Sequence, residues 1–343
     1  MTSAPGICFL IIGLPRSGTS SISQLLENLG VYFGDPSHFL DTTQNTHNPI
    51  FYELKWANDF NDAVINKLKP AKTRVSDQLP IEEDFNRPEI AAFRQPLEQR
   101  IADEFGDHAM VGIKDPRISS TYPLWQSVLT GMGYTVKTIL AIRTASAILK
   151  SNLKLTPLPL NSWRRWYVRH LLGMTYFTRK VSPCRFDYDQ LMRDPLGYGK
   201  EKAAELGLAM PDPAAATRHI SPGLYHHQPD NTGTGDQWVD QIDAAFRSGR
   251  LEPDEYLRYR RAALLFTEEL WEFDTYIKVR QAHEATQMRA GTASPNDQVP
   301  QQPNTQQWLQ DYQRLQALLR QGGQFDVEPR PDGGMNIRRV SKS

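Results

Sequence analysis

The segment from Phe9 to Ser21 constrains the fold of this chain more than any other. An apolar run ends at Gly13, a short loop follows, and an amphipathic stretch begins after Gly18. A strand, a tight loop and a helix in this order present backbone N–H groups and a positive helix end to an anion. The two glycines have the spacing of a phosphate-binding loop, but Thr19 stands where that pattern has lysine. The loss of this lysine argues against ordinary phosphoryl transfer from ATP or GTP.

Length and composition indicate a globular protein. The 343 residues suit one large domain, or one domain with an appendage. Lys plus Arg and Asp plus Glu number 39 each, so no global field favours nucleic acid or an anionic membrane. Only two cysteines are present, which excludes a disulfide scaffold and fits a reducing compartment. The run from Ile7 to Leu14 is far shorter than the roughly 20 residues that span a bilayer. We therefore expect a buried strand there, no transmembrane segment, and a cytoplasmic protein.

Apolar runs alternate with helical patterns along the chain. Runs rich in β-branched residues occur at 110–113, at 136–142 and around Phe186, and helical patterns such as 89–105 lie between them. This alternation predicts an α/β fold, in which helices cover both faces of a mostly parallel central sheet. The expected architecture is a three-layer αβα sandwich.

Three distinctive residues directly follow apolar runs. Gly13, Lys114 and Arg143 each lie where such a run ends. Ligands of parallel sheets bind beyond the carboxyl ends of the strands, near the point where the strand order reverses. We therefore expect these three residues to lie along one edge of the sheet.

The composition changes near the end of a predicted long helix that runs from Pro253 to about Lys278. Residues 1–282 are expected to form the main domain. Residues 283–307 are rich in Gln, Pro and Asn and are expected to form a flexible linker. Residues 308–343 are expected to contain an amphipathic helix and a polar tail. Three alternatives stay open for this segment: it binds a partner, packs back on the main domain, or is disordered.

Four short motifs occur in a fixed order. They are the loop Pro15-Arg16-Ser17-Gly18-Thr19-Ser20, the segment Lys114-Asp115-Pro116-Arg117, Arg143 with Ser151 eight positions later, and Tyr188-Asp189-Gln190-Leu191. Together they resemble the sulfotransferases that use 3′-phosphoadenosine 5′-phosphosulfate (PAPS), in particular the bacterial and Golgi carbohydrate-type branch. The resemblance spans roughly residues 6–280. It implies a fold that contains a phosphate-binding loop (P-loop), and sulfuryl transfer to a hydroxyl or amine without a metal.

The resemblance also implies which residues bind the donor. In this family the loop wraps the 5′-phosphosulfate, which here assigns Pro15, Arg16, Ser17, Gly18, Thr19, Ser20 and Ser21. Arg16 matches the cation that stabilises the bridging oxygen as the S–O bond breaks, where preorganised charge contributes most. Arg143 and Ser151 match the pair that holds the 3′-phosphate, and the fork of arginine suits phosphate. Tyr188 resembles a tyrosine near the adenine ring.

Candidate catalytic residues follow from two segments. Lys114 and Arg117 are expected to face the sulfuryl group or the acceptor. A base must take the proton of the acceptor, and Glu53 is the first candidate, since the segment ending there resembles one near the acceptor in bacterial members. His226, His227 and Asp115 remain alternatives for this base, with His227 kept among the catalytic residues.

The identity of the acceptor stays open between a small molecule, a lipid and a carbohydrate. Trp163, Arg164, Arg165 and Trp166 interleave aromatic rings with cations, which suits a glycan but also an ordinary amphipathic helix. Two other classes of function are consistent with the loop. One is a catalytically inactive P-loop scaffold that binds partners through the tail, and the other is a P-loop small-molecule kinase.

Overall fold

The structure is a computed structural model of the chain. It describes residues 6–41, 51–68, 80–106, 108–155, 160–218, 220, 233–265, 325–329 and 335–339. The chain divides into two compact units, Met1–Lys278 and Val279–Ser343. The first unit contains the sheet and the residues of the predicted site.

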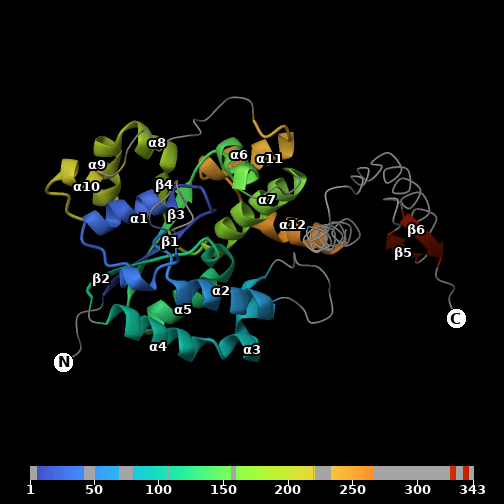
Figure 1. Cartoon of the computed structure of the whole chain (residues 1–343), viewed down its shortest axis with the longest axis horizontal. Helices are drawn as coiled ribbons and strands as arrows, with labels where there is room; N and C mark the ends of the chain where they lie inside the picture. The colour runs from blue at the N-terminus through green and yellow to red at the C-terminus, as the bar shows by residue number, and fades with distance from the viewer. Residues whose placement is uncertain are drawn as a thin grey trace, which may run out of the picture. The chain divides into compact units, whose positions relative to one another are not determined.

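A parallel sheet forms the centre of the first unit (Figure 1). Its strands are β1 (Ile7–Ile12), β2 (Met110–Lys114), β3 (Thr135–Ile142) and β4 (Cys184–Asp187), in the order β2-β1-β3-β4. Each neighbouring pair is parallel. Tyr32 adds an isolated parallel bridge to Val111 at the β2 edge. The predicted mostly parallel sheet is confirmed.

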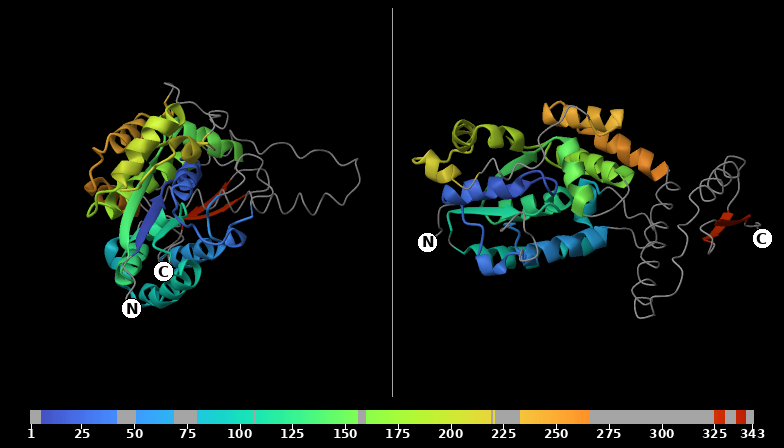
Figure 2. Two further views of the ribbon diagram at one scale, coloured as in Figure 1. Left: turned by 90° about the vertical axis from the view of Figure 1, so that its left-hand side faces the viewer. Right: turned by 45° about the horizontal axis from the view of Figure 1, so that its top comes forward.

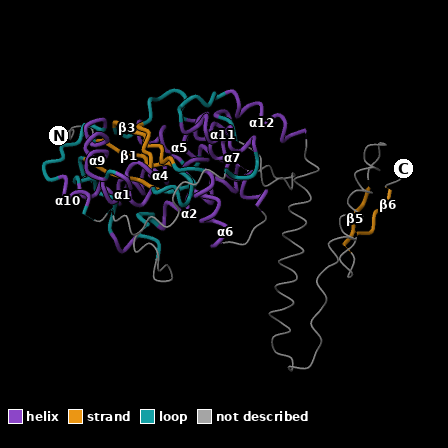
Figure 3. Tube along the Cα trace, turned by 90° about the horizontal axis from the view of Figure 1, so that it is seen from above, coloured by secondary structure: helices purple, strands orange, loops and turns teal. Residues whose placement is uncertain are grey.

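Helices cover both faces of the sheet, as Figures 2 and 3 also show. One face carries α1 (Thr19–Asn28), α8 (Tyr188–Arg193), α9 (Pro195–Glu205) and α10 (Pro213–Thr217). The core of the other face is built with α2 (Lys55–Leu68), α3 (Pro88–Ala91), α4 (Arg94–Phe105), α5 (Ile118–Gly131), α6 (Ala145–Leu155), α7 (Leu160–Phe177), α11 (Gln237–Arg247) and α12 (Asp254–Leu265). Two short 3₁₀ helices, Pro36–His38 and Glu82–Asn86, lie in the loops. The predicted three-layer architecture is therefore confirmed.

The central strand shows why both faces must be covered. Side chains of a strand alternate between its two sides. Cys8, Leu10 and Ile12 accordingly pack into the core that contains α5, whereas Phe9 and Ile11 pack into the core that contains α1. A strand that is apolar on both sides reads as one continuous apolar run, which is the pattern of a buried parallel strand.

The helix expected over 89–105 is two helices in the structure. α3 ends at Ala91 and α4 begins at Arg94. Pro96 lies in the first turn of α4, where its missing N–H is harmless, but it could not have donated to Ala92 in an unbroken helix. The proline therefore explains why a second helix begins here.

The second unit contains two paired strands that were not expected from the sequence. β5 (Phe325–Pro329) and β6 (Met335–Arg339) pair antiparallel, with Val327 opposite Ile337. β-branched residues at this central pair favour a strand in what was expected to be a polar tail. The expected linker, the helix at 308–319 and the end of the helix from Pro253 lie outside the described residues. None of the helices in the described ranges has the length and apolar character needed to cross a membrane.

We predict that Leu10→Ala lowers the free energy of unfolding by about 2–5 kcal/mol, because it leaves a cavity at a position that is 0% exposed. The matched control is Leu196→Ala on α9, where the leucine is 49% exposed. The control should change stability by less than about 0.5 kcal/mol. Urea denaturation of both variants measures the difference, and equal effects would contradict the central place of β1.

Candidate active site

The carboxyl ends of β1, β2 and β3 meet at one edge of the sheet. Ile11 pairs with Lys114 and Ile12 pairs with Leu140, two residues before β3 ends at Ile142. Gly13, Lys114 and Arg143 therefore leave the sheet along the same edge, as expected. After β1 the chain enters α1 on one face, and after β3 it enters α6, which packs in the core of the other face. Loops that part to opposite faces in this way form the ligand crevice of parallel sheets.

The loop after β1 depends on two glycines. Gly18 has φ +89°, and a Cβ there would overlap the ring of Tyr188. A Cβ at Gly13 would lie 2.7 Å from the Cβ of Ala141 and 2.8 Å from the Oγ of Ser17. Glycine is therefore needed at Gly18 for both backbone conformation and space, and at Gly13 for space.

The start of α1 is open to an anion. Gly18 is the N-cap, and no side chain in the described part of the chain caps this helix. First-turn N–H groups that no cap side chain satisfies are the donors that bind anions at helix N-termini. Ser17 has a different role, because its N–H and its hydroxyl both donate to the carbonyl of Leu14, at 3.1 and 2.7 Å.

Four of the residues predicted to bind the sulfuryl donor form a chain of contacts beside this loop. They are Arg16, Arg143, Ser151 and Tyr188, and they are here called the arginine cluster. Arg16 Nε donates to Ser151 Oγ at 2.9 Å. Arg143 Nη1 donates to the backbone oxygen of Arg16, also at 2.9 Å. Arg143 Cζ lies 4.7 Å from the ring centroid of Tyr188, a cation–π contact. The eight-residue spacing of Arg143 and Ser151 thus places both against Arg16.

Electrostatics of the arginine cluster favour an anion. Burial and the nearby Arg143 guanidinium lower the pKa of Arg16. Arg143 is 9% exposed, and its Nε lies 3.8 Å from Asp189 Oδ1. Burial raises the pKa of Tyr188, so its hydroxyl stays protonated. An anion between the two guanidinium groups would relieve their mutual repulsion.

A second group, the lysine cluster, consists of Phe51, Glu53, Lys114 and Asp115. Lys114 Nζ lies 2.5 Å from Glu53 Oε1 and donates to the carbonyl oxygen of Phe51 at 2.9 Å. The same carbonyl accepts a long bond of 3.4 Å from Ser20 Oγ on α1. The segment 51–53 is therefore tied both to the end of β2 and to the helix that follows the phosphate loop.

Asp115 is the most deeply buried carboxylate of the lysine cluster, at 1% exposure. Its Oδ1 accepts the N–H of Arg117 at 2.7 Å, while Oδ2 has no hydrogen-bond partner among the described residues. Burial and the negative charge of Glu53 raise the pKa of Asp115 to about 6. Of the base candidates, Glu53 is ion-paired with Lys114, and the desolvated Asp115 lies 3.5 Å from Nη1 of Arg117. His226 and His227 lie outside the described residues.

The remaining predicted residues have mixed placements. Thr19 is buried, and its Cγ2 would lie 3.0 Å from a Cβ at Gly13. Pro15, Ser20 and Ser21 are partly exposed at the loop and the start of α1. In the aromatic and basic stretch of α7, Trp163 and Trp166 meet edge to face at 5.2 Å. Residues of the four motifs therefore lie in two contact clusters, the arginine cluster and the lysine cluster. The aromatic and basic stretch lies on the amphipathic helix α7.

Three residues near these clusters were not assigned from the sequence. Asp189 belongs to the fourth motif but was given no role there, and its carboxylate pairs with Arg143. Thr144 follows Arg143 and keeps a buried Oγ1 without a hydrogen-bond partner in the described ranges. Tyr52 precedes Glu53 and has φ +58°. A threonine between a strand end and a helix is a usable sequence signal, but the backbone conformation of a tyrosine is not.

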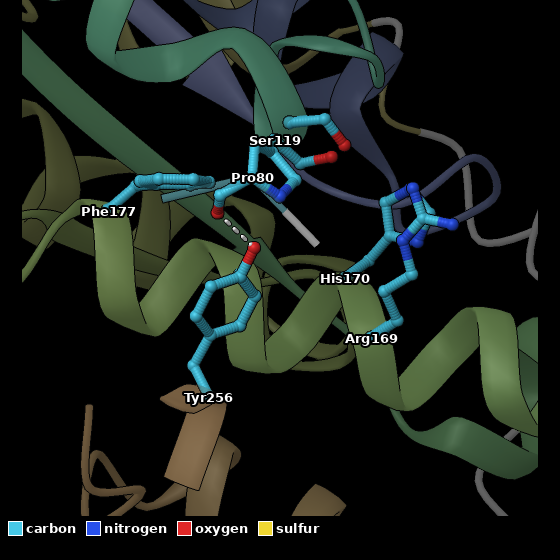
Figure 4. Close-up of a pocket in the computed structure, with 8 residues that line it drawn as sticks. Pro80, Ser119, Arg169, His170, Phe177 and Tyr256 are labelled. Carbon is cyan, nitrogen blue, oxygen red and sulfur yellow. Dashed lines mark hydrogen bonds between the residues drawn. The ribbon is translucent and has the colours of Figure 1, made fainter. Parts of the chain in front are cut away.

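A separate small cavity lies between α5, α7 and α12 (Figure 4). Its volume of about 10 Å³ is close to the least that holds one water. The Tyr256 hydroxyl donates to the Pro80 carbonyl there, at 2.5 Å. His170 also lines it; Nδ1 donates to the Trp166 carbonyl at 2.7 Å, and burial lowers the pKa of His170 to about 3. This cavity shares no residue with either cluster and is too small for a nucleotide.

Comparisons with known proteins found distant structural likenesses only. The sulfotransferase domain of the Synechococcus PCC 7002 olefin synthase is 15% identical, with a TM-score of 0.43, and the match covers 71% of this chain and 95% of that one. The sulfotransferase domain of the curacin biosynthetic pathway is 14% identical, with a TM-score of 0.41 and coverages of 71% and 98%. Sulfotransferase STF1 from Mycobacterium tuberculosis H37Rv is 15% identical, with a TM-score of 0.38 and coverages of 71% and 77%. No protein-family model and no curated protein matches the chain. Likenesses this distant do not assign a function.

We predict that Asp115→Asn raises the free energy of unfolding more at pH 7 than at pH 4. The folded pKa of Asp115, about 6, lies above the ordinary 3.8, so the wild type loses stability as pH rises through this window. The full shift corresponds to about 3 kcal/mol. Denaturation of both proteins at the two pH values measures it, and the same difference at pH 4 and pH 7 would contradict the burial of this charge.

Proposed function

We propose that the protein is a sulfotransferase that moves a sulfuryl group from PAPS to a hydroxyl or amine. The observation that carries this proposal is the contact of Arg16 with both Arg143 and Ser151 beside the uncapped start of α1. PAPS carries two separate anionic groups, one on each end of its ribose. We assign these two groups to two features at the edge of the sheet, namely the first-turn N–H groups of α1 and the arginine cluster.

The residues at this edge fit such a donor. Glycine at positions 13 and 18 lets the loop pack closely against Ala141 and Tyr188, because an added Cβ would overlap these side chains. Thr144 offers a buried hydroxyl without a hydrogen-bond partner among the described residues. The loop has neutral donors where ATP enzymes have lysine, which suits a sulfuryl group because it carries less charge than a terminal phosphate. We assign the 5′-phosphosulfate to the loop from Pro15 to Ser21 and the 3′-phosphate to Arg143 and Ser151.

In the proposed reaction, three residues of the chain have different roles. The S–O bond to the bridging oxygen breaks as a new bond forms from sulfur to the acceptor oxygen or nitrogen. Arg16 stabilises the charge that grows on the leaving phosphate. Lys114 supplies an N–H to the transferring group, and Glu53 takes the acceptor's proton. The products are the sulfated acceptor and adenosine 3′,5′-bisphosphate, and no metal takes part.

The acceptor is proposed only by class, as a small molecule, lipid or carbohydrate with a free hydroxyl or amine. The cytoplasm remains the proposed compartment. A partner for the helix expected at 308–319 also remains a prediction, because that helix lies outside the described residues.

Binding of adenosine 3′,5′-bisphosphate tests the donor site. We expect the wild type to bind it more tightly than AMP, because only the bisphosphate can use Arg143. Arg143→Ala should weaken this binding by roughly 10–100-fold, since a charge-assisted contact is lost. Arg165→Ala, an exposed arginine on α7, is the matched control and should bind normally. Calorimetric titration measures all four cases. Tighter binding of ATP with magnesium than of the bisphosphate would contradict the proposal and favour a kinase.

Turnover tests the catalytic cation. We expect Arg16→Ala to lower turnover by about 10²–10³-fold, because it removes charge stabilisation of the leaving group. Radiolabelled PAPS is used first to find an acceptor and then to measure the rate of transfer. Circular dichroism must show that the variant is folded. Near-normal turnover of a folded Arg16→Ala variant would exclude Arg16 from this role.

A further inference from the structure

Two non-glycine residues have a positive φ within the described ranges, and both border the candidate site. They are Arg16, at φ +72°, and Tyr52, at φ +58°. L-residues avoid this left-handed region because Cβ approaches the carbonyl oxygen. Such a conformation persists only where the surroundings over-determine it. The conformation of Arg16 belongs to the tight loop after β1. The conformation of Tyr52 needs a separate explanation.

The turn at Tyr52 directs two acceptors to one cation. The carbonyl before it, of Phe51, and the carboxylate after it, of Glu53, both contact Lys114 Nζ. Tyr52 stands between these two acceptors, so its φ of +58° sets the direction of the Phe51 carbonyl relative to the Glu53 carboxylate. An ammonium has three N–H donors. Within the described residues, this segment accepts from two of those on Lys114.

The side chain of Tyr52 holds the turn in place. It is 3% exposed, and its ring meets Phe33 at 5.4 Å and Phe39 at 5.8 Å between centroids. Its hydroxyl donates to Glu27 Oε2 at 2.6 Å. Burial and Glu27 raise the pKa of Tyr52, so the hydroxyl remains a donor. Glu27 lies in the last turn of α1, where the helix dipole disfavours a carboxylate, so its presence there is not explained by helix stability.

We propose that Tyr52 is a positioning residue whose left-handed turn orients Lys114 and Glu53 for transfer, with α1 as its anchor. Helix α1 starts at the phosphate loop and, through Glu27, also holds Tyr52. One helix thus sets the distance between the donor site and the Lys114–Glu53 pair. The role in transfer rests on the proposed function, but the effect on Lys114 does not.

Two substitutions at one position separate the turn from the side chain. Tyr52→Ala and Tyr52→Gly both remove the ring, but only glycine tolerates positive φ without a penalty. We expect Tyr52→Ala to lower kcat about tenfold relative to Tyr52→Gly. Affinity for adenosine 3′,5′-bisphosphate should be the same in both, because the arginine cluster is untouched. Equal kcat in the two variants would overturn the proposal.

A measurement that needs no turnover keeps this test independent of the proposed function. A buried, hydrogen-bonded lysine ammonium gives a slowly exchanging signal in ¹H–¹⁵N spectra, which Lys114→Met would assign. We expect this signal in the wild type and in Tyr52→Gly, and its loss in Tyr52→Ala. A signal that persists equally in both variants would overturn the positioning role, even if the protein proved to bind no PAPS.

A gentler pair of variants covers the case in which loss of the ring unfolds the protein. Tyr52→Phe and Glu27→Ala each remove the hydroxyl–carboxylate bond and keep the ring. We expect the two single variants and the double variant to weaken the Lys114 signal to the same extent, because one contact is shared. No change in any of the three would overturn the anchoring role of α1.

Discussion

The parallel pairing of β1 with β2 and β3 determines where the candidate functional residues of this protein lie. Because the three strands end at one edge, segments that are more than 100 residues apart in sequence become neighbours, as in the contact of Arg16 in the loop after β1 with Ser151 in α6, 135 positions on. The pairing in turn depends on β1 being apolar on both sides. Each side chain of β1 therefore packs into one of the two cores. This packing fixes the ends of the strands, and with them the positions of the site residues.

Two residues beside the ends of these strands have a backbone conformation of unfavourable energy. Arg16 and Tyr52 both occupy the left-handed region, one in the loop after β1 and one in the segment held against Lys114. Each costs on the order of 1–3 kcal/mol, which the packed surroundings must offset. Strain of this kind is concentrated at functional sites. It is consistent with a site in which charged groups are held in place before a ligand arrives, so that little reorganisation accompanies binding.

The sequence predicted the fold correctly, and its motifs named the residues that the structure brings together as the arginine cluster, for identifiable reasons. Apolar runs that end at Gly13, Lys114 and Arg143 fix the edge, and the order of four motifs indicated the arginine cluster. The pairing of Lys114 with Glu53 was not foreseen, because it depends on a turn at Tyr52 that no residue pattern signals. The split between α3 and α4 could have been predicted from Pro96. The strands at 325–339 could not be separated from a polar tail, because the polar residues around Val327 and Ile337 dominate that pattern.

The crystal structure of the complex with adenosine 3′,5′-bisphosphate would test the central claim most directly. We predict that the 5′-phosphate lies on the backbone N–H groups at the start of α1. We also predict the 3′-phosphate within hydrogen-bond distance of Arg143 and Ser151, with Arg16 released from Ser151 or shared between them. A nucleotide bound away from this edge, or with the two phosphates exchanged, would contradict the account.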